Sequence, residues 1–249
     1  MNGSRADSAF TDRPRHQVSP CPVTLDSVPT DDHQTRRHST AYVVAPDSGR
    51  GPGVLVLHGW WGMTPFVRQM CDRLADAGFA VLAPDLFEGR TADAPDEAES
   101  LLADMDVDRA VDVVMVTSAT LRDLPICQDR PIGVVGLSMG ASLALWLAAR
   151  APEQVAATVA YYGTQNIDFE PAQAAFLGHF AERDELVADD DVVELEAHLR
   201  LLGKEVEFHR YAGTGHWFVE EDRPAAYDAG AASIAWERTL NFLTRHLAA

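Results

Sequence analysis

Residues 136–140, which read G-L-S-M-G, constrain the fold of this chain more than any other segment. An apolar run over 132–137 leads into them, and an Ala-rich, helix-forming segment over 141–150 leads out. A strand, a G-x-S-x-G turn and a helix, in this order, form a sharp and strained turn that lifts the serine side chain clear of the backbone. We therefore predict a strand-to-helix turn with Ser138 at its tip, as a candidate nucleophile.

The motif has a plainer alternative, a Gly-rich β-to-α turn in an ordinary α/β protein. At ordinary glycine and serine frequencies, about one chain in ten of this length contains the five-residue pattern by chance. The segments that surround the motif decide between the two interpretations.

Strand-like and helix-like segments alternate along the chain. We expect strands over 41–45, 53–57, 79–83, 132–137, 155–162, 175–181 and 205–211. We expect helices over 65–77, with Thr64 as the cap, and over 98–124, 141–150, 189–202 and 225–246. Such alternation produces right-handed βαβ crossovers. It predicts an α/β fold with a mostly parallel central sheet and helices on both faces.

The domain organisation follows from the two ends of this pattern. Residues 1–22 are polar, contain proline and lack periodicity, so we expect a disordered N-terminal arm there and a single domain over 23–249. Only residues 163–174 separate two of the later strands. Because this connection is too short for a lid domain, we predict an open, shallow site.

Composition and charge narrow the classes of partner. The formal net charge is −18 and Lys204 is the only lysine, so the surface repels nucleic acid and anionic membranes. No apolar run approaches the roughly 18 residues of a membrane-spanning helix, and no secretory signal is recognised. The scattered Cys21, Cys71 and Cys127 predict free thiols in a reducing compartment. We expect a cytoplasmic monomer or homodimer with a small-molecule substrate.

A serine nucleophile needs a general base, and the base needs an orienting carboxylate. In hydrolases built around such a turn, the chain order is Ser, then Asp or Glu, then His. Asp184 and His216 follow late strands, at the sheet edge where ligands bind in open α/β folds. The acids that compete with Asp184 are Glu182, Glu185 and Asp189 to Asp191. His216 differs from the other histidines after Ser138 because it lies beside glycine in a loop that follows a strand.

Two backbone amides are candidates for holding a developing oxyanion. Met139 begins the helix after the turn, and Trp60 lies in the loop after the 53–57 strand, with Trp61 as the next choice. The tryptophan rings either wall the acyl pocket or belong to the core, and the sequence favours neither. We expect no metal and no cofactor, because no H-E-x-x-H is present and the acidic run 189–191 suits the first turn of a helix.

Several segments together resemble the dienelactone hydrolase family of α/β-hydrolases. They are residues 56–62 (VLHGWWG), 74–87 (LADAGFAVLAPDLF), 136–140, 161–163 (YYG), 178–184 (GHFAERD) and 211–218 (YAGTGHWF). The resemblance covers about residues 40–246. It implies a lidless hydrolase that cleaves esters or lactones through an acyl-enzyme, without a cofactor. It implies a triad of Ser138, Asp184 and His216, and we expect Trp61, Arg90, Tyr162 and Trp217 to contact the substrate.

Three positions depart from the enzymes that give the family its name. Those enzymes have cysteine where this chain has Ser138, and a glutamate paired with that cysteine where this chain has Gly59. They hold the substrate carboxylate with two arginines; one position is Glu220 here, and the other falls near Gly89 and Arg90. We therefore expect a serine esterase for neutral or hydrophobic esters. The alternatives are a catalytically idle α/β-hydrolase that binds small molecules, and a thioesterase or acyltransferase.

Overall fold

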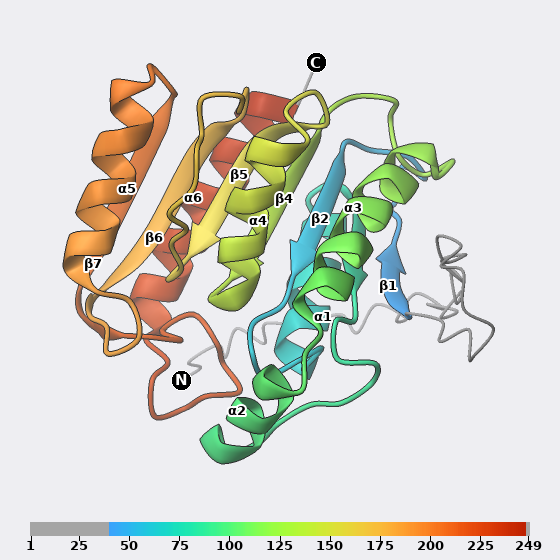
Figure 1. The fold of residues 1–249 in the computed structure, drawn as a ribbon. Helices are drawn as coiled ribbons and strands as arrows, with labels where there is room; N and C mark the ends of the chain where they lie inside the picture. Colours follow the sequence, from blue (N-terminus) through green and yellow to red (C-terminus); the bar gives the residue numbers. More distant parts are fainter. Residues whose placement is uncertain (1–39, 248–249) are drawn as a thin grey trace, which may run out of the picture.

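The computed structural model describes residues 40–247, so the arm predicted over residues 1–22 lies outside the described part of the chain. Within that part, seven strands form one sheet (Figure 1). The strands are β1 (Ala41–Val44), β2 (Gly53–Leu57), β3 (Ala80–Pro84), β4 (Ile132–Leu137), β5 (Val155–Tyr161), β6 (Ala175–Arg183) and β7 (Val206–Gly215). The helices are α1 (Pro65–Asp76), α2 (Pro95–Ala103), α3 (Val107–Asp123), α4 (Met139–Arg150), α5 (Asp189–Leu201) and α6 (Ala229–Leu247).

The sheet has the strand order β1-β3-β2-β4-β5-β6-β7. Every neighbouring pair is parallel except β1 and β3, which pair antiparallel at one edge. The predicted mostly parallel α/β sheet is therefore confirmed. Strand β4 lies in the middle of the sheet, so the turn that follows it emerges at the centre of the edge formed by the carboxyl ends of the strands.

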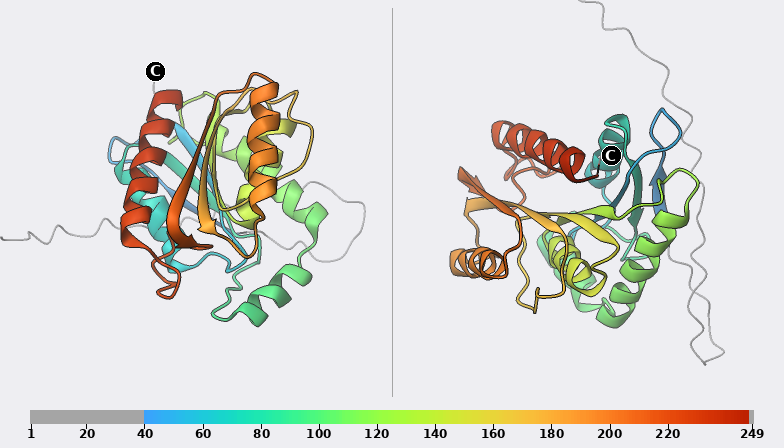
Figure 2. Two further views of the ribbon diagram at one scale, coloured as in Figure 1. Left: turned by 90° about the vertical axis from the view of Figure 1, so that its left-hand side faces the viewer. Right: turned by 90° about the horizontal axis from the view of Figure 1, so that it is seen from above.

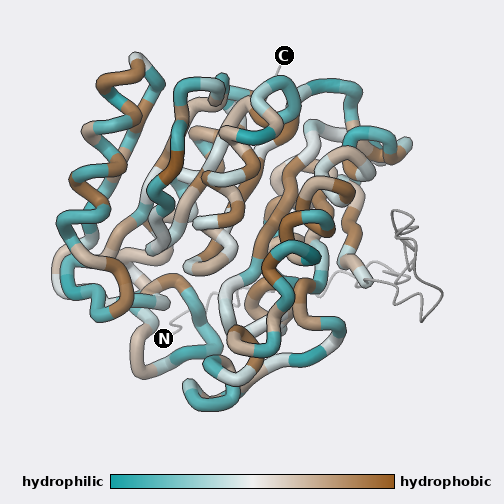
Figure 3. Tube along the Cα trace, viewed as in Figure 1, coloured by the Kyte–Doolittle hydropathy of each residue, from teal (hydrophilic) through white to brown (hydrophobic). Residues whose placement is uncertain are grey.

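Helices cover both faces of the sheet, as Figure 2 shows in two views. One core cluster joins the sheet to α1 and α6, and a second joins its other face to α3, α4 and α5. Strands β2 and β4 are buried along their whole length, which explains their continuous apolar sequence. The hydropathy-coloured trace shows the same arrangement, with apolar residues concentrated in the inner strands (Figure 3). No lid domain lies over this framework within residues 40–247.

The prediction of one helix over 98–124 is wrong, and the prediction of Thr64 as the cap of α1 is right in position only. The single helix expected over 98–124 is two helices, α2 and α3, because Asp106 caps a new helix by accepting a hydrogen bond from the amide of Arg109, 3.1 Å away. Thr64 stands at the N-cap position of α1, but its side chain makes no capping bond and its buried hydroxyl has no partner among the described residues. Pro65 at the first helical position starts this helix without it.

The connection between β5 and β6 runs over residues 162–174 and is tied to the α5–β7 turn. Lys204 donates hydrogen bonds to the carbonyls of Glu170, at 2.9 Å, and Ala172, at 2.5 Å. These bonds hold the segment against the sheet. No helix of the described chain is long and apolar enough to cross a membrane.

Candidate active site

The turn after β4 has the strained geometry that its sequence predicts. Ser138 has φ of +51°, in a region that residues other than glycine rarely adopt. A Cβ atom on Gly136 would lie 2.2 Å from the carbonyl oxygen of Gly140, and one on Gly140 would lie 2.2 Å from that of Leu57. Both contacts are with backbone, which cannot move aside cheaply. The turn therefore needs glycine on each side of the serine.

A third glycine, which follows the end of β5, supports the same turn. A Cβ atom on Gly163 would lie 2.4 Å from the carbonyl oxygen of Ser138. The amide of Ser138 donates to the carbonyl of Tyr161 at 2.9 Å. The backbone of residues 161–163 thus holds Ser138 in place, a role for Gly163 that the sequence analysis missed.

The three residues predicted as a triad lie within hydrogen-bond distance of one another. The Nε2 atom of His216 is 2.9 Å from the Oγ atom of Ser138. The Nδ1 atom of His216 is 2.8 and 2.9 Å from the two carboxylate oxygens of Asp184. Because an ionised carboxylate only accepts, Nδ1 carries the proton and Nε2 is free to accept from the serine hydroxyl. The side chains of His216 and Asp184 are only 4% and 7% exposed, whereas Ser138 is partly open to solvent.

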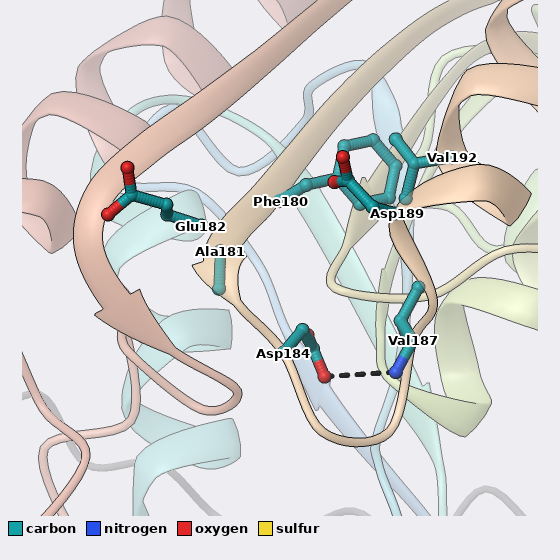
Figure 4. A pocket seen from close by; sticks show the side chains of 7 residues that line it. All are labelled: Phe180, Ala181, Glu182, Asp184, Val187, Asp189 and Val192. Carbon is teal, nitrogen blue, oxygen red and sulfur yellow. Dashed lines mark hydrogen bonds between the residues drawn. The ribbon is translucent and has the colours of Figure 1, made fainter.

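The turn after β6 holds the Asp184 carboxylate in its orientation. One oxygen accepts hydrogen bonds from the amides of Leu186, at 2.9 Å, and Val187, at 3.0 Å. Asp184 also lines a small cavity of about 50 Å³ beneath this turn (Figure 4). The competing acids have other partners: Glu182 accepts from the amide of Gly213 at 2.7 Å, and Asp189 pairs with Arg210. Neither contacts His216.

A tight turn after β2 lies against the serine. The amide of Gly62 donates to the carbonyl of Gly59 at 3.2 Å, which places Trp60 and Trp61 at the two central positions of the turn. A Cβ atom on Gly59 would lie 3.5 Å from the Cβ atom of Ser138. On the other side, the Met139 amide is the first of α4, and helix geometry leaves it without an intrahelical acceptor. Amides from both segments therefore lie close to Ser138.

Three tryptophans form an aromatic cluster beside these elements. The ring centroids of Trp60, Trp61 and Trp217 are 5.3 to 5.6 Å apart, and the ring of Trp217 lies 4.9 Å from that of His216. The cluster packs with Met139 and α2, and Trp217 also packs against the core that joins the sheet to α1 and α6. All three indole nitrogens are buried without a hydrogen-bond partner among the described residues. Trp217 also has φ of +65°, a strained conformation directly after the histidine.

The two arginines near this cluster differ in what they contact. Arg223 lies over the ring of Trp61, 3.8 Å from its centroid, and donates to the carbonyls of Ala92 at 2.9 Å and Asp93 at 3.2 Å. Arg90 is half exposed and pairs with Asp104 at 3.2 Å. No contact joins Arg90 to the triad within residues 40–247. The sequence analysis therefore missed Arg223.

Glu220 is buried rather than open to the site. It is 3% exposed and accepts a hydrogen bond of 2.6 Å from the hydroxyl of Tyr162. Burial raises the pKa of Glu220 to about 8, and the bond from Tyr162 only partly opposes this shift. At neutral pH this side chain is mainly the uncharged acid. The ring of Tyr162 lies 4.6 Å from that of His216, so the pair supports the histidine from behind.

No group of three or more His, Cys, Asp or Glu side chains in residues 40–247 is arranged to hold a metal ion. The constellation of a serine, a histidine, a carboxylate and nearby backbone amides has the geometry for nucleophilic attack on a carbonyl carbon.

Comparison with known proteins points in the same direction. The sequence profile of the dienelactone hydrolase family matches residues 39–247. The chain is 34% identical over 215 residues to a putative carboxymethylenebutenolidase of Aquifex aeolicus, covering 83% of this chain and 93% of that protein. It is 30% identical over 216 residues to carboxymethylenebutenolidase 1 of Cupriavidus pinatubonensis, covering 82% and 90%. A crystal structure of a putative dienelactone hydrolase from Klebsiella pneumoniae aligns with a TM-score of 0.75 at 22% identity, covering 84% and 94%.

Proposed function

The chain belongs to the dienelactone hydrolase family of α/β-hydrolases, which makes it a hydrolase of ester or lactone bonds, and we propose that Ser138 is its nucleophile. The observation that carries this proposal is the hydrogen-bonded chain from Ser138 through His216 to Asp184, with distances of 2.9 and 2.8 Å. A serine stands where the enzymes that give the family its name have cysteine, and the distance of 2.9 Å between Oγ and Nε2 of His216 supports activation by this histidine.

In the proposed reaction, the Ser138 oxygen bonds to the ester carbonyl carbon while its proton passes to Nε2 of His216. Asp184 holds the imidazole in the correct tautomer and stabilises the imidazolium. The amides of Met139 and Trp60 hold the oxyanion, a contribution that is typically worth about 10²–10³ in rate for each donor. The leaving alcohol takes the proton from His216. Water then attacks the acyl-enzyme, with His216 as the base, and releases the acid.

We propose neutral or hydrophobic esters as the preferred substrates. The wall next to the triad is made of Trp60, Trp61 and Trp217, which favours apolar or aromatic groups. No arginine stands at position 220 to hold a substrate carboxylate; the buried Glu220 is bonded to Tyr162 instead. The expected contacts of Trp61, Arg90 and Trp217 with the substrate remain part of this proposal. Tyr162 is fully buried and bonded to Glu220, so we propose that it supports His216 instead of touching the substrate.

A fluorophosphonate probe tests the nucleophile directly, since it reacts with an activated serine. We expect labelling at Ser138, located by peptide mass spectrometry, together with hydrolysis of p-nitrophenyl esters. Ser138→Ala should lose both. Ser142→Ala is the matched control, because Ser142 is one helical turn away and only donates to the carbonyl of Thr164 at 2.7 Å. A folded wild-type protein that neither labels nor hydrolyses esters would contradict the proposal and favour a small-molecule binder.

A further inference from the structure

His58 is a fully buried histidine next to the nucleophile that the reaction above does not use. It directly follows β2, and its exposed fraction is 0%. Both ring nitrogens are bonded: Nδ1 lies 2.7 Å from the carbonyl oxygen of Gly59, and Nε2 lies 3.0 Å from the amide nitrogen of Leu86. A buried imidazole with two fixed partners can hold its neighbours in one arrangement.

The chemistry of the two partners fixes a single form of the imidazole. A carbonyl oxygen can only accept, so Nδ1 carries a proton; a backbone amide can only donate, so Nε2 carries a lone pair. Burial lowers the pKa of His58, although the bond to Gly59 and the charge of Asp85 act in the opposite direction. The ring is therefore neutral, with its proton on Nδ1.

The bond to Gly59 acts on the amide that is proposed to hold the oxyanion. The carbonyl of Gly59 and the N–H of Trp60 belong to one planar peptide group, so fixing the carbonyl also fixes the direction of the N–H. This peptide lies against the serine, since a Cβ atom on Gly59 would be 3.2 Å from the carbonyl oxygen of Leu137 and 3.5 Å from the Cβ atom of Ser138. A small rotation of the peptide would turn the Trp60 N–H away from the reacting carbonyl.

The other partner links His58 to the loop after β3. Asp85 organises that loop by accepting hydrogen bonds from the amides of Phe87 at 3.0 Å and Gly89 at 2.7 Å. Leu86, which donates to His58, lies inside the same turn. The imidazole therefore connects two segments that the chain itself joins only through α1 and β3.

We propose that His58 is a positioning residue that aligns the Trp60 amide for oxyanion binding, by donating from Nδ1 to the carbonyl of Gly59. This inference rests on the proposed function, because it needs an oxyanion at Ser138. His58 does not touch the substrate, and its effect is exerted through the orientation of one peptide group.

Two substitutions separate the two bonds. In His58→Asn, the side-chain amide nitrogen can occupy the place of Nδ1 and donate to Gly59, while the bond from Leu86 is lost. In His58→Gln, the amide reaches the place of Nε2 and can accept from Leu86, while the side-chain donor to Gly59 is lost and the 3.2 Å bond from the amide of Gly62 remains. We expect kcat of the Gln variant to fall about 10- to 100-fold with KM changed less than about 2-fold, as for a partly misaligned oxyanion donor. The Asn variant should retain most of the wild-type kcat.

His179→Gln is the control for a general loss of packing. His179 is also fully buried with both nitrogens bonded, to the hydroxyls of Tyr211 at 2.8 Å and Thr239 at 3.0 Å, but it contacts neither the turn nor Ser138. This variant should unfold at lower temperature and keep its kcat. Equal kcat values for the Asn and Gln variants of His58, or a Gln variant as active as wild type, would overturn the proposal.

A measurement on the wild-type protein covers the case in which the His58 variants do not fold. Nitrogen-15 NMR should find His58 neutral at pH 7 with its proton on Nδ1, the less common tautomer in solution. A proton on Nε2, or a cationic ring, would contradict the proposed bond. Wild-type protein that labels at Ser138 but fails these tests refutes only the role of His58, whereas wild-type protein that does not label refutes the proposed function itself.

Discussion

The turn after β4 and the loop after β7 meet at Ser138, and they are held in place by different means. In the turn, the contacts are between backbone atoms and depend on Gly136, Gly140 and Gly163. In the loop, side-chain hydrogen bonds hold the backbone in place: Glu220 is bonded to Tyr162, and Arg223 is bonded to the segment that leads into α2. Residues 136–140 predict the turn from sequence, although the support from Gly163 is seen only in the folded structure, and the contacts of the loop are all of this second kind.

The largest predicted effect tests whether the two regions act as one catalytic unit. His216→Ala leaves the turn unaltered and should still lower kcat/KM by about 10⁴-fold or more, because Ser138 would lose the base that we propose for it. Ser138→Ala should lower kcat/KM by about the same factor. The double variant should be no worse than either single one, since residues that act together show non-additive losses. Losses that multiply in the double variant would show that the two regions contribute independently.

The next effect concerns the backbone contacts of the turn. Gly140→Ala places a Cβ atom 2.2 Å from the carbonyl oxygen of Leu57 and 2.6 Å from that of His58. We expect it to lower the free energy of unfolding by at least about 4 kcal/mol, or to prevent folding. Urea denaturation measures the change.

Gly230→Ala provides the matched comparison, because its nearest neighbour, an oxygen of Asp228, would be 3.4 Å from the new Cβ atom. That substitution should change stability by no more than about 1 kcal/mol, in the favourable direction for a helix. Similar losses for the two alanine variants would show that backbone contact at the turn is not what requires glycine.

The buried acid of the loop predicts a dependence of stability on pH. The pKa of Glu220 is raised to about 8 in the folded protein, from an ordinary value of 4.5. The group therefore stabilises the fold fully below pH 4.5, and this stabilisation is lost as pH rises towards 8, at up to about 1.4 kcal/mol per unit.

Glu220→Gln keeps an oxygen that accepts from Tyr162 but cannot ionise. Relative to wild type, we expect this variant to gain on the order of 3 kcal/mol in unfolding free energy between about pH 5 and about pH 8. Urea unfolding at several pH values measures the difference. Parallel stability curves for the two proteins would mean that Glu220 ionises normally in the folded state.

The smallest effect concerns Arg223, which fastens the loop to the segment before α2. Arg223→Gln removes the cation–π contact with Trp61 and weakens the two bonds to carbonyls, so we expect a loss of about 1 kcal/mol. Hydrogen exchange should become faster in residues 92–103 and stay unchanged in α4. Arg223→Lys keeps the charge, so its stability and exchange rates should lie between those of the wild type and those of Arg223→Gln. Unchanged exchange in both variants would show that the tryptophan packing alone holds the loop to the segment before α2.

Much of the fold could be predicted from the sequence because its signals are local. The strands 53–57 and 132–137 were predicted with the observed bounds, since burial on both faces leaves a continuous apolar run. The break between α2 and α3 was not predicted, because helical spacing of apolar residues continues across Asp104 to Asp106. The strand predicted to end at residue 211 extends to Gly215, so His216 directly follows β7.

In the candidate site, too, some residues could be predicted from the sequence and others could not. The sequence named Ser138, Asp184 and His216 from motif and chain order, and the structure brings them together. It could not show that Tyr162 binds Glu220, 58 residues away, or that Arg223 binds the carbonyl of Ala92, 131 residues away. Such pairs have no fixed spacing. They arise from the register of the strands and the paths of the loops.

The backbone support of Ser138 has a consequence for how this enzyme could be altered. Three glycines and the carbonyls they approach fix Ser138, the proposed nucleophile, without using the side chains of the tryptophan cluster. The tryptophan wall can therefore be exchanged residue by residue, in a directed-evolution library or over natural divergence, while the reacting oxygen stays where it is. The substrate range can then change without a change in the position of the reacting serine.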